Sequence, residues 1–167
     1  MKNAQNEGKA VTLPAQGTNP PLRLLAAFQQ IYPALAPTYI VQAPGRDMWV
    51  AASVAQTSAF TIHVPDLNGH TSFSRRSARS HRTLLKRPLP RWARYPAGVV
   101  IALSDSGMDI DGIDTVVVSE EPPGPRYDYA LGMTFVALIH SLHDRPYNSN
   151  SLLDIVEKVR REYVEGL

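Results

Sequence analysis

The chain of 167 residues contains no cysteine, which excludes disulfides, thiol nucleophiles, iron–sulfur clusters and cysteine-ligated zinc. Its longest apolar runs, residues 99–103 and 135–139, are far shorter than the roughly 20 residues needed to cross a membrane. The N-terminal segment MKNAQNEGKAVTLPAQ lacks the apolar stretch of a signal peptide. These absences predict a cytoplasmic protein without a membrane partner.

Charge is unevenly distributed, although the formal net charge is only +2. No acidic residue lies between Asp66 and Asp105, and this segment carries a block of basic side chains. They are Arg75, Arg76, Arg79, Arg82, Lys86, Arg87, Arg91 and Arg94. Such a block is either a solvated loop, balanced by the acidic second half of the chain, or a surface that binds phosphates.

The hydrophobic pattern predicts a flexible tail over residues 1–20 and one domain over residues 21–167. The elements we expect, in chain order, are a helix over 22–31, strands over 38–42, 48–54 and 59–64, a helix from about 92 that ends at Gly107, a strand over 115–119, a helix over 127–143 and a last helix capped by Asn150 or Ser151. A short polar link between the second and third strands predicts that they form a hairpin. The basic segment up to Pro90 shows no periodicity. The order of elements predicts an α+β fold, with a mixed sheet and helices packed on one face.

General catalytic motifs are absent from the sequence. It contains no G-x-S-x-G elbow, no P-loop and no dinucleotide-binding glycine pattern. His140 and His143 lie one helical turn apart, but no third ligand is evident, so we predict no metal site.

Several segments, taken in order, resemble the GHMP sugar kinases, in particular the N-terminal half of galactokinase and its arabinokinase relatives. A helix and a strand lead into Ala43-Pro44-Gly45-Arg46, which is similar to the family's APGR motif. Farther on come Trp92-x-x-Tyr95-x-x-Gly98, the Gly107 to Asp114 segment, Ser119-x-x-Pro122-x-Gly124 and the closing Arg161-Glu162-Tyr163-Val164. The resemblance implies the fold of that kinase half.

The resemblance also implies a chemistry and a set of site residues. Galactokinase transfers the γ-phosphoryl group of ATP, with Mg²⁺, to the anomeric hydroxyl of a sugar. By this resemblance Arg46 is the catalytic residue beside the reacting hydroxyl, and the nucleotide-binding residues are Trp92, Tyr95, Ser119, Pro122 and Gly124. Packing offers another interpretation of the same residues: a strand-ending turn, two core aromatics and a stiff connector.

The sequence departs from the family where phosphate and sugar would bind. Asp47-Met48-Trp49 follows Arg46 where the family has its Glu-His-x-Asp set for sugar hydroxyls. The family's glycine- and serine-rich phosphate loop is replaced by Gly124 to Gly132, in which Pro125 removes an N–H donor and Asp128 repels phosphate. The segment that would hold the family's catalytic aspartate and C-terminal domain is missing from this chain. These departures predict a catalytically incomplete domain.

Three functional hypotheses follow. The first is a pseudoenzyme that retains nucleotide or sugar binding, or that regulates through a protein partner. The second is an active sugar kinase half completed by another chain or by a homodimer. The third is a phosphate- or nucleic-acid-binding module that uses residues 75–94 with Phe73 and Trp92; we expect its nucleic-acid binding to be weak and to vanish near physiological salt.

Overall fold

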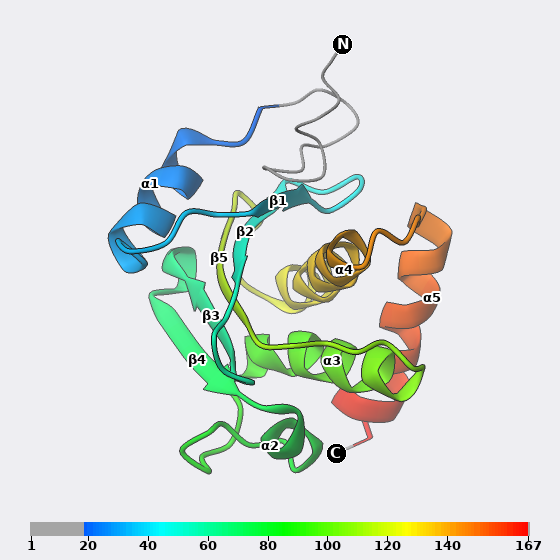
Figure 1. Cartoon of the computed structure of the whole chain (residues 1–167). Coiled ribbons are helices and arrows are strands. Elements are labelled where there is room, and N and C mark those ends of the chain that lie inside the picture. Colours follow the sequence, from blue (N-terminus) through cyan, green and yellow to red (C-terminus); the bar gives the residue numbers. More distant parts are fainter. Residues whose placement is uncertain (1–18, 167) are drawn as a thin grey trace.

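The computed structural model describes residues 19–166, so the predicted tail lies almost entirely outside the described residues (Figure 1). The strands are β1 (Tyr39–Gln42), β2 (Met48–Val54), β3 (Phe60–Val64), β4 (Gly69–Phe73) and β5 (Ile113–Ser119). The helices are α1 (Leu22–Ile31), α2 (Arg75–Arg79), α3 (Arg94–Asp105), α4 (Pro125–Leu142) and α5 (Ser149–Val159). Short helical turns are η2 (Pro65–Leu67), η3 (Arg91–Ala93) and η4 (Arg160–Val164). Within residues 19–166, none of the helices has the length and apolar character to span a membrane.

The five strands form one mixed sheet in the order β1-β2-β5-β3-β4. Only the β3–β5 pair is parallel, and the other pairs are antiparallel. The predicted hairpin between β2 and β3 is therefore wrong, because β5 is inserted between these two strands. Buried residues occupy β5 on both faces, and a strand with this character takes the centre of a sheet.

Gly112 allows the connection between β2 and β3 to cross over the start of β5. A side chain at Gly112 would collide with the backbone carbonyl oxygens of Thr57 and Ala59. The crossing is fixed by a hydrogen bond from the Ala55 N–H to the Gly112 carbonyl (2.9 Å). The sequence predicted a turn at this glycine, and the structure uses it as a close contact between two backbone segments.

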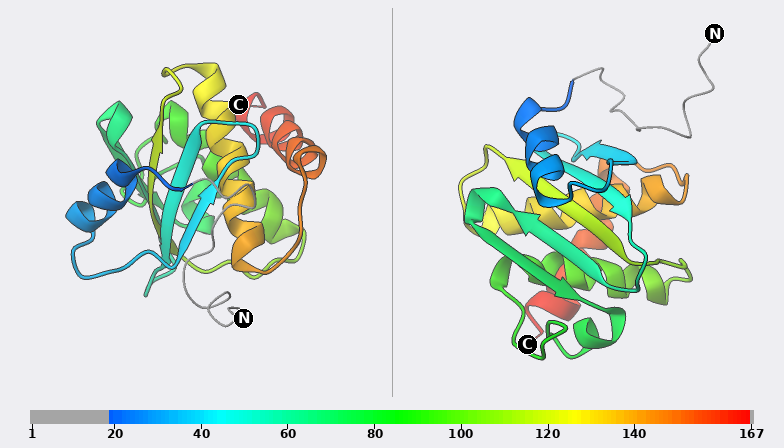
Figure 2. Two further views of the ribbon diagram at one scale, coloured as in Figure 1. Left: turned by 90° about the horizontal axis from the view of Figure 1, so that it is seen from above. Right: turned by 60° about the vertical axis from the view of Figure 1, so that its left-hand side comes forward.

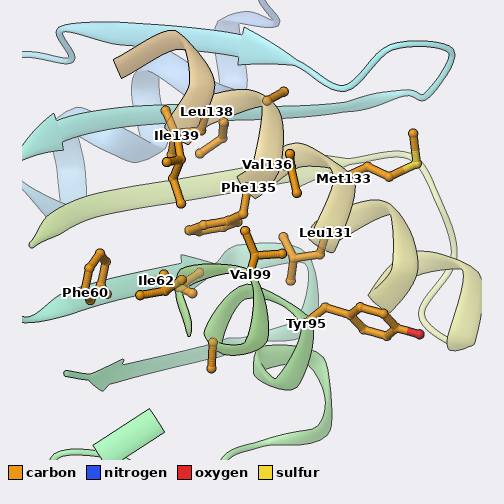
Figure 3. Packing of buried hydrophobic residues seen from close by; sticks show 14 of the residues in the cluster. Phe60, Ile62, Tyr95, Val99, Leu131, Met133, Phe135, Val136, Leu138 and Ile139 are labelled. Carbon is orange, nitrogen blue, oxygen red and sulfur yellow. The ribbon is translucent and has the colours of Figure 1, made fainter. Parts of the chain in front are cut away.

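Helices α3, α4 and α5 cover one face of the sheet and form the main core (Figures 2 and 3). Phe60 and Phe73, from β3 and β4, stack in this core with ring centroids 5.5 Å apart. The alternation along β3 supports this arrangement, since Phe60, Ile62 and Val64 all point into it. The predicted α+β class and mixed sheet are thus confirmed.

Helix α1 lies on the opposite face, which corrects the expectation that all helices share one side (Figure 2). Its buried side chains Leu24 and Phe28 pack with Trp49 of β2 and with the valines of β5 that point away from the main core. Those valines, Val116 and Val118, alternate with Val117, which belongs to the main core. The all-valine centre of β5 thus serves two cores.

Two local predictions also need correction. The basic segment, expected to lack structure, contains β4 and α2; β4 has only one strongly apolar residue, Phe73, and this hid the strand. The last helix is capped by Asn148, whose side chain accepts from the Ser151 N–H at 2.9 Å. Ser151 completes a capping box from inside the helix, so neither Asn150 nor Ser151 is the N-cap.

Candidate functional site

One end of the sheet brings together the turn between β1 and β2, the turn η2, the end of β5 and the start of α4. Ser119, the last residue of β5, joins three of these segments. Its hydroxyl donates to the Asp47 carbonyl (2.7 Å), and its N–H donates to Oδ2 of Asp66 (2.8 Å). Four of the six predicted site residues, Arg46, Ser119, Pro122 and Gly124, therefore lie on segments that meet at this end.

Arg46 closes the turn between β1 and β2. Its N–H donates to the Ala43 carbonyl (3.1 Å), and Gly45 between them has a φ of +70°. A proline followed by a glycine with positive φ is the signature of a type II turn. The guanidinium Nη1 of Arg46 is buried and has no hydrogen-bond partner among residues 19–166. The motif thus makes a strand-ending turn and also leaves a charged donor unused.

The Ser119 hydroxyl both donates and accepts a hydrogen bond within the protein. Besides donating to Asp47, the hydroxyl accepts from the Glu121 N–H (2.9 Å). Pro122 is exposed, and Gly124 has a φ of +149°, a conformation that favours glycine. Ser119 is therefore engaged in holding the loop, whereas Gly124 provides the bend into α4.

Trp92 and Tyr95 both pack against glycines. A side chain at Gly69 would lie 3.3 Å from Cζ2 of the half-buried Trp92. Tyr95 is 8% exposed, and its ring meets that of Tyr129 edge-on with centroids 5.7 Å apart. Figure 3 shows Tyr95 at the start of α3, beside α4. Both aromatics have the packing roles proposed as the alternative, and their predicted place at an adenine ring stays a prediction.

The start of α4 carries an ion pair between the buried Asp128 and the largely exposed Arg91. The Oδ2 of Asp128 lies 2.8 Å from Nε of Arg91, and Asp128 is only 4% exposed. Burial raises the pKa of Asp128, and the charge of Arg91 opposes that shift. The other carboxylate oxygen, Oδ1, has no partner among the described residues. A negative charge therefore occupies the first turn of α4, where the helix dipole favours anions.

A second charge network ties α1 to the same end of the sheet. Arg23 donates to Asp66 Oδ1 (2.8 Å), to Glu120 Oε2 (3.0 Å) and to the Ser119 carbonyl (3.0 Å). In the same loop, Nε of Arg126 lies 3.7 Å from Oε2 of Glu121. Sequence reasoning missed Arg23 and Asp66, because the partners are far apart in the chain and no local pattern marks them.

Three buried polar atoms without partners belong to this end. They are Arg46 Nη1, Tyr127 OH and Asp128 Oδ1, and Ser104 Oγ completes the set for residues 19–166. Burial and the nearby carboxylates of Asp66 and Asp128 raise the pKa of Tyr127, so its hydroxyl stays protonated. Buried polar atoms are normally paired, so their concentration here sets this end apart from the rest of residues 19–166.

The residues at the start of α4 do not fit a phosphate group with Mg²⁺. Phosphates bind at helix starts through free N–H groups and the positive end of the dipole. Here the first helical residue is Pro125, which has no N–H, and Asp128 neutralises the dipole. No group of three or more His, Asp or Glu side chains that could hold a metal occurs in the described part of the chain.

A cavity of about 300 Å³ lies on the other face, between α1 and the β3–β4 hairpin. Its polar lining comes from Gln30, Asn68 and the cross-strand pair His63 and His70, whose rings stack with centroids 5.1 Å apart. Burial and the proximity of His70 lower the pKa of His63. The volume is at the small end of the range for small-molecule sites.

No family model and no curated protein sequence matches the chain. Solved structures do match its fold. Galactokinase from Lactococcus lactis, in complex with galactose, has a TM-score of 0.64 at 13% identity, over 86% of this chain and 42% of that one. A mevalonate kinase has a TM-score of 0.55 at 10% identity, over 71% and 38% of the two chains. The mevalonate kinase of Methanococcus jannaschii has a TM-score of 0.54 at 9% identity, over 69% and 36%.

These neighbours are GHMP kinases, and the chain spans less than half the length of each. The α+β fold expected from the sequence motifs is thus the fold observed.

Proposed function

We propose that this chain is a galactokinase-like domain that does not transfer phosphoryl groups on its own and serves as a binding or regulatory module. One observation carries the proposal: the Arg91–Asp128 ion pair fills the start of α4. A phosphate placed there would meet the buried carboxylate of Asp128, and Pro125 would offer it no N–H donor. Displacing the carboxylate would leave Arg91 without its partner and would break the local structure.

The other groups at this end support the same conclusion. The Ser119 hydroxyl, which a nucleotide site would need free, is engaged with Asp47 and Glu121. Of the cations nearest the loop, Arg23 is bound to Asp66 and Glu120, and the exposed Arg126 lies 3.7 Å from Glu121. The pairing of Arg23 thus engages a charge that would otherwise be available to a triphosphate.

A second candidate function is a kinase half completed by another chain. The unused Nη1 of Arg46 favours it, because a buried guanidinium N–H without a partner can donate a hydrogen bond to a ligand oxygen. The two candidates differ in whether any phosphoryl transfer can be measured.

The first expected result is that the protein shows no sugar kinase turnover. A coupled assay of ADP release with galactose, arabinose and mevalonate would measure it, with and without Mg²⁺. Any turnover must be compared with that of Arg46→Ala, in which the predicted catalytic residue is removed. Turnover above background that disappears in Arg46→Ala would refute the proposal and favour the second candidate.

The second expected result concerns ATP affinity, measured by titration calorimetry. We expect weak binding that does not depend on Mg²⁺, because the start of α4 offers no metal ligand beyond a carboxylate paired with Arg91. Asp128→Asn should bind ATP at least about fivefold more tightly, since a like charge within a few ångströms of the phosphates is removed. Asp154→Asn, at an exposed position of α5 without an ion-pair partner among residues 19–166, is the control for a general change in net charge. Tight, Mg²⁺-dependent binding by the unmodified chain would contradict this expectation.

A further inference from the structure

We propose that the loop of residues 82–88, called here the leucine loop, is a docking site for an anionic membrane surface. It follows α2 and lies at the lower edge of the molecule in Figure 1. The proposal is independent of the proposed function, because none of the groups at the start of α4 takes part in it.

The leucine loop has a defined shape that holds its tip outward. An antiparallel bridge joins Arg82 to Pro88, and the Thr83 N–H donates to the Arg87 carbonyl (2.8 Å). The Lys86 N–H donates to the Thr83 carbonyl (2.9 Å), so the tip is a hydrogen-bonded turn. The Leu84 N–H donates to the Ser72 carbonyl of β4 (2.9 Å) and anchors the loop to the sheet.

Two consecutive leucines occupy the tip and are exposed. Leu85 is 78% exposed and Leu84 is 45% exposed. The other large apolar side chains that are exposed in residues 19–166 occur singly in the chain: Leu22, Leu35, Val54 and Leu153. An adjacent apolar pair at the tip of a projecting turn suits insertion into a soft apolar phase.

Exposed cations lie on both sides of the two leucines along the chain. Arg82, Lys86 and Arg87 flank them in the loop, all exposed and without a carboxylate partner among the described residues. Arg75 and Arg76, also exposed and unpaired there, begin α2 directly after β4, where Leu84 is anchored. By contrast, Arg79 and Arg91 of the same basic block are bound to Asp105 and Asp128. The leucine loop and the start of α2 thus carry five exposed cations without a carboxylate partner among residues 19–166.

Anionic lipid explains this combination better than nucleic acid does. Single-stranded nucleic acids bind through aromatic side chains on which bases stack. Phe73 is fully buried, and the half-buried Trp92 packs against Gly69, so the basic segment offers bases no fully exposed aromatic side chain. Leucines gain from leaving water for the acyl boundary, while the long arginine and lysine side chains reach the phosphate headgroups. This inference replaces the expectation of no membrane partner, which rested on spanning segments alone.

Vesicle sedimentation of the full chain tests the proposal. We expect binding to vesicles of equal parts phosphatidylcholine and phosphatidylglycerol, and no binding to pure phosphatidylcholine. Binding should weaken between ~50 and ~300 mM salt as the charges are screened. Leu85→Trp should show a blue-shifted emission with the anionic vesicles only, since the new indole enters an apolar environment.

Two variants separate the contributions of the tip and the cations. Leu84→Ser/Leu85→Ser should lower partitioning at least about tenfold, because two apolar side chains no longer leave water. Arg75→Ala/Arg76→Ala/Lys86→Ala/Arg87→Ala should lower it roughly several hundredfold, since each cation near an anionic surface contributes about fivefold. Leu22→Ser/Leu153→Ser and Arg145→Ala, at exposed positions elsewhere, should leave it unchanged. Circular dichroism and thermal unfolding confirm that each variant folds.

Three outcomes would overturn the proposal. The first is no binding to anionic vesicles at ~50 mM salt. The second is binding that the leucine variant retains in full, which would indicate a plain polyanion surface. The third is tighter binding to duplex DNA or to polyglutamate than to the vesicles, which would identify a nucleic acid or an acidic protein as the partner.

Discussion

Gly112→Ala is expected to destabilise the protein by about 3 kcal/mol or more, which corresponds to a fall in melting temperature of roughly 10 °C. The new methyl group would overlap the carbonyl oxygens of Thr57 and Ala59 and would lie 2.8 Å from the Ala59 nitrogen. These are backbone atoms, so no side-chain rotation relieves the overlap. The crossing loop cannot simply lift, because the Ala55 N–H is bonded to the Gly112 carbonyl.

Gly107→Ala is the matched control for this prediction. It is also a glycine-to-alanine change, at the end of α3, but a methyl group there would meet nothing within 4 Å. Its φ of +104° costs an alanine about 1–2 kcal/mol. Thermal and urea unfolding of both variants would measure the difference. An equal loss in the two variants would show that the crossing of β2–β3 over β5 is not what Gly112 provides.

Local patterns in the sequence were sufficient for most individual elements. Apolar residues at helical spacing predicted α1 over residues 22–31, the bounds that the structure has. The apolar run in residues 48–54 predicted β2 with its observed bounds. Both segments carry their own signal, because α1 buries residues at helical spacing and β2 is a continuous run of buried residues.

Contacts between distant segments could not be predicted in the same way. The insertion of β5 between β2 and β3 depends on which strand is apolar on both faces, and α1 could have packed on either side of the sheet. β4 shows a further limit: its core face consists of Thr71 and Phe73, too few apolar residues to indicate a strand. Topology arises from competition among segments for the same core, which no window of sequence contains.

The candidate site was predictable in part for the same reason. The motifs marked the turn at Arg46 and the loop from Ser119 to Gly124, and both lie at one end of the sheet. Asp128 stood out as a carboxylate where phosphate would bind. Its partner Arg91 did not, because it belonged to a run of eight cations that are equivalent in sequence. The fold distinguishes them: Arg79 and Arg91 are paired, and those around the leucine loop are free.

Arg91→Ala is expected to lower the free energy of unfolding by about 2 kcal/mol at pH 7, because it leaves the buried carboxylate of Asp128 without its counter-ion. Breaking a fully buried pair costs more, but the Arg91 side chain is 61% exposed and water screens part of its charge. Asp128→Asn/Arg91→Ala should regain most of the loss, since no charge is then left buried. Arg126→Ala is the control: its side chain is 82% exposed and faces Glu121 at 3.7 Å, so the change should fall within about 0.5 kcal/mol.

The pH dependence of the stability loss in Arg91→Ala tests whether the unpaired carboxylate of Asp128 causes that loss. Burial already raises the pKa of Asp128 above its ordinary value, and loss of Arg91 raises it further. As pH falls, the folded state therefore takes up this proton before the unfolded state does, and protonation removes the buried charge. The stability difference between Arg91→Ala and the unmodified protein should be largest at pH 7 and should shrink steadily toward pH 4.

Urea unfolding at several pH values measures this difference, and subtracting the values of the unmodified protein cancels the titration of His63 and other groups. A difference that stays constant down to pH 4 would mean that Arg91 stabilises the fold through packing rather than through Asp128.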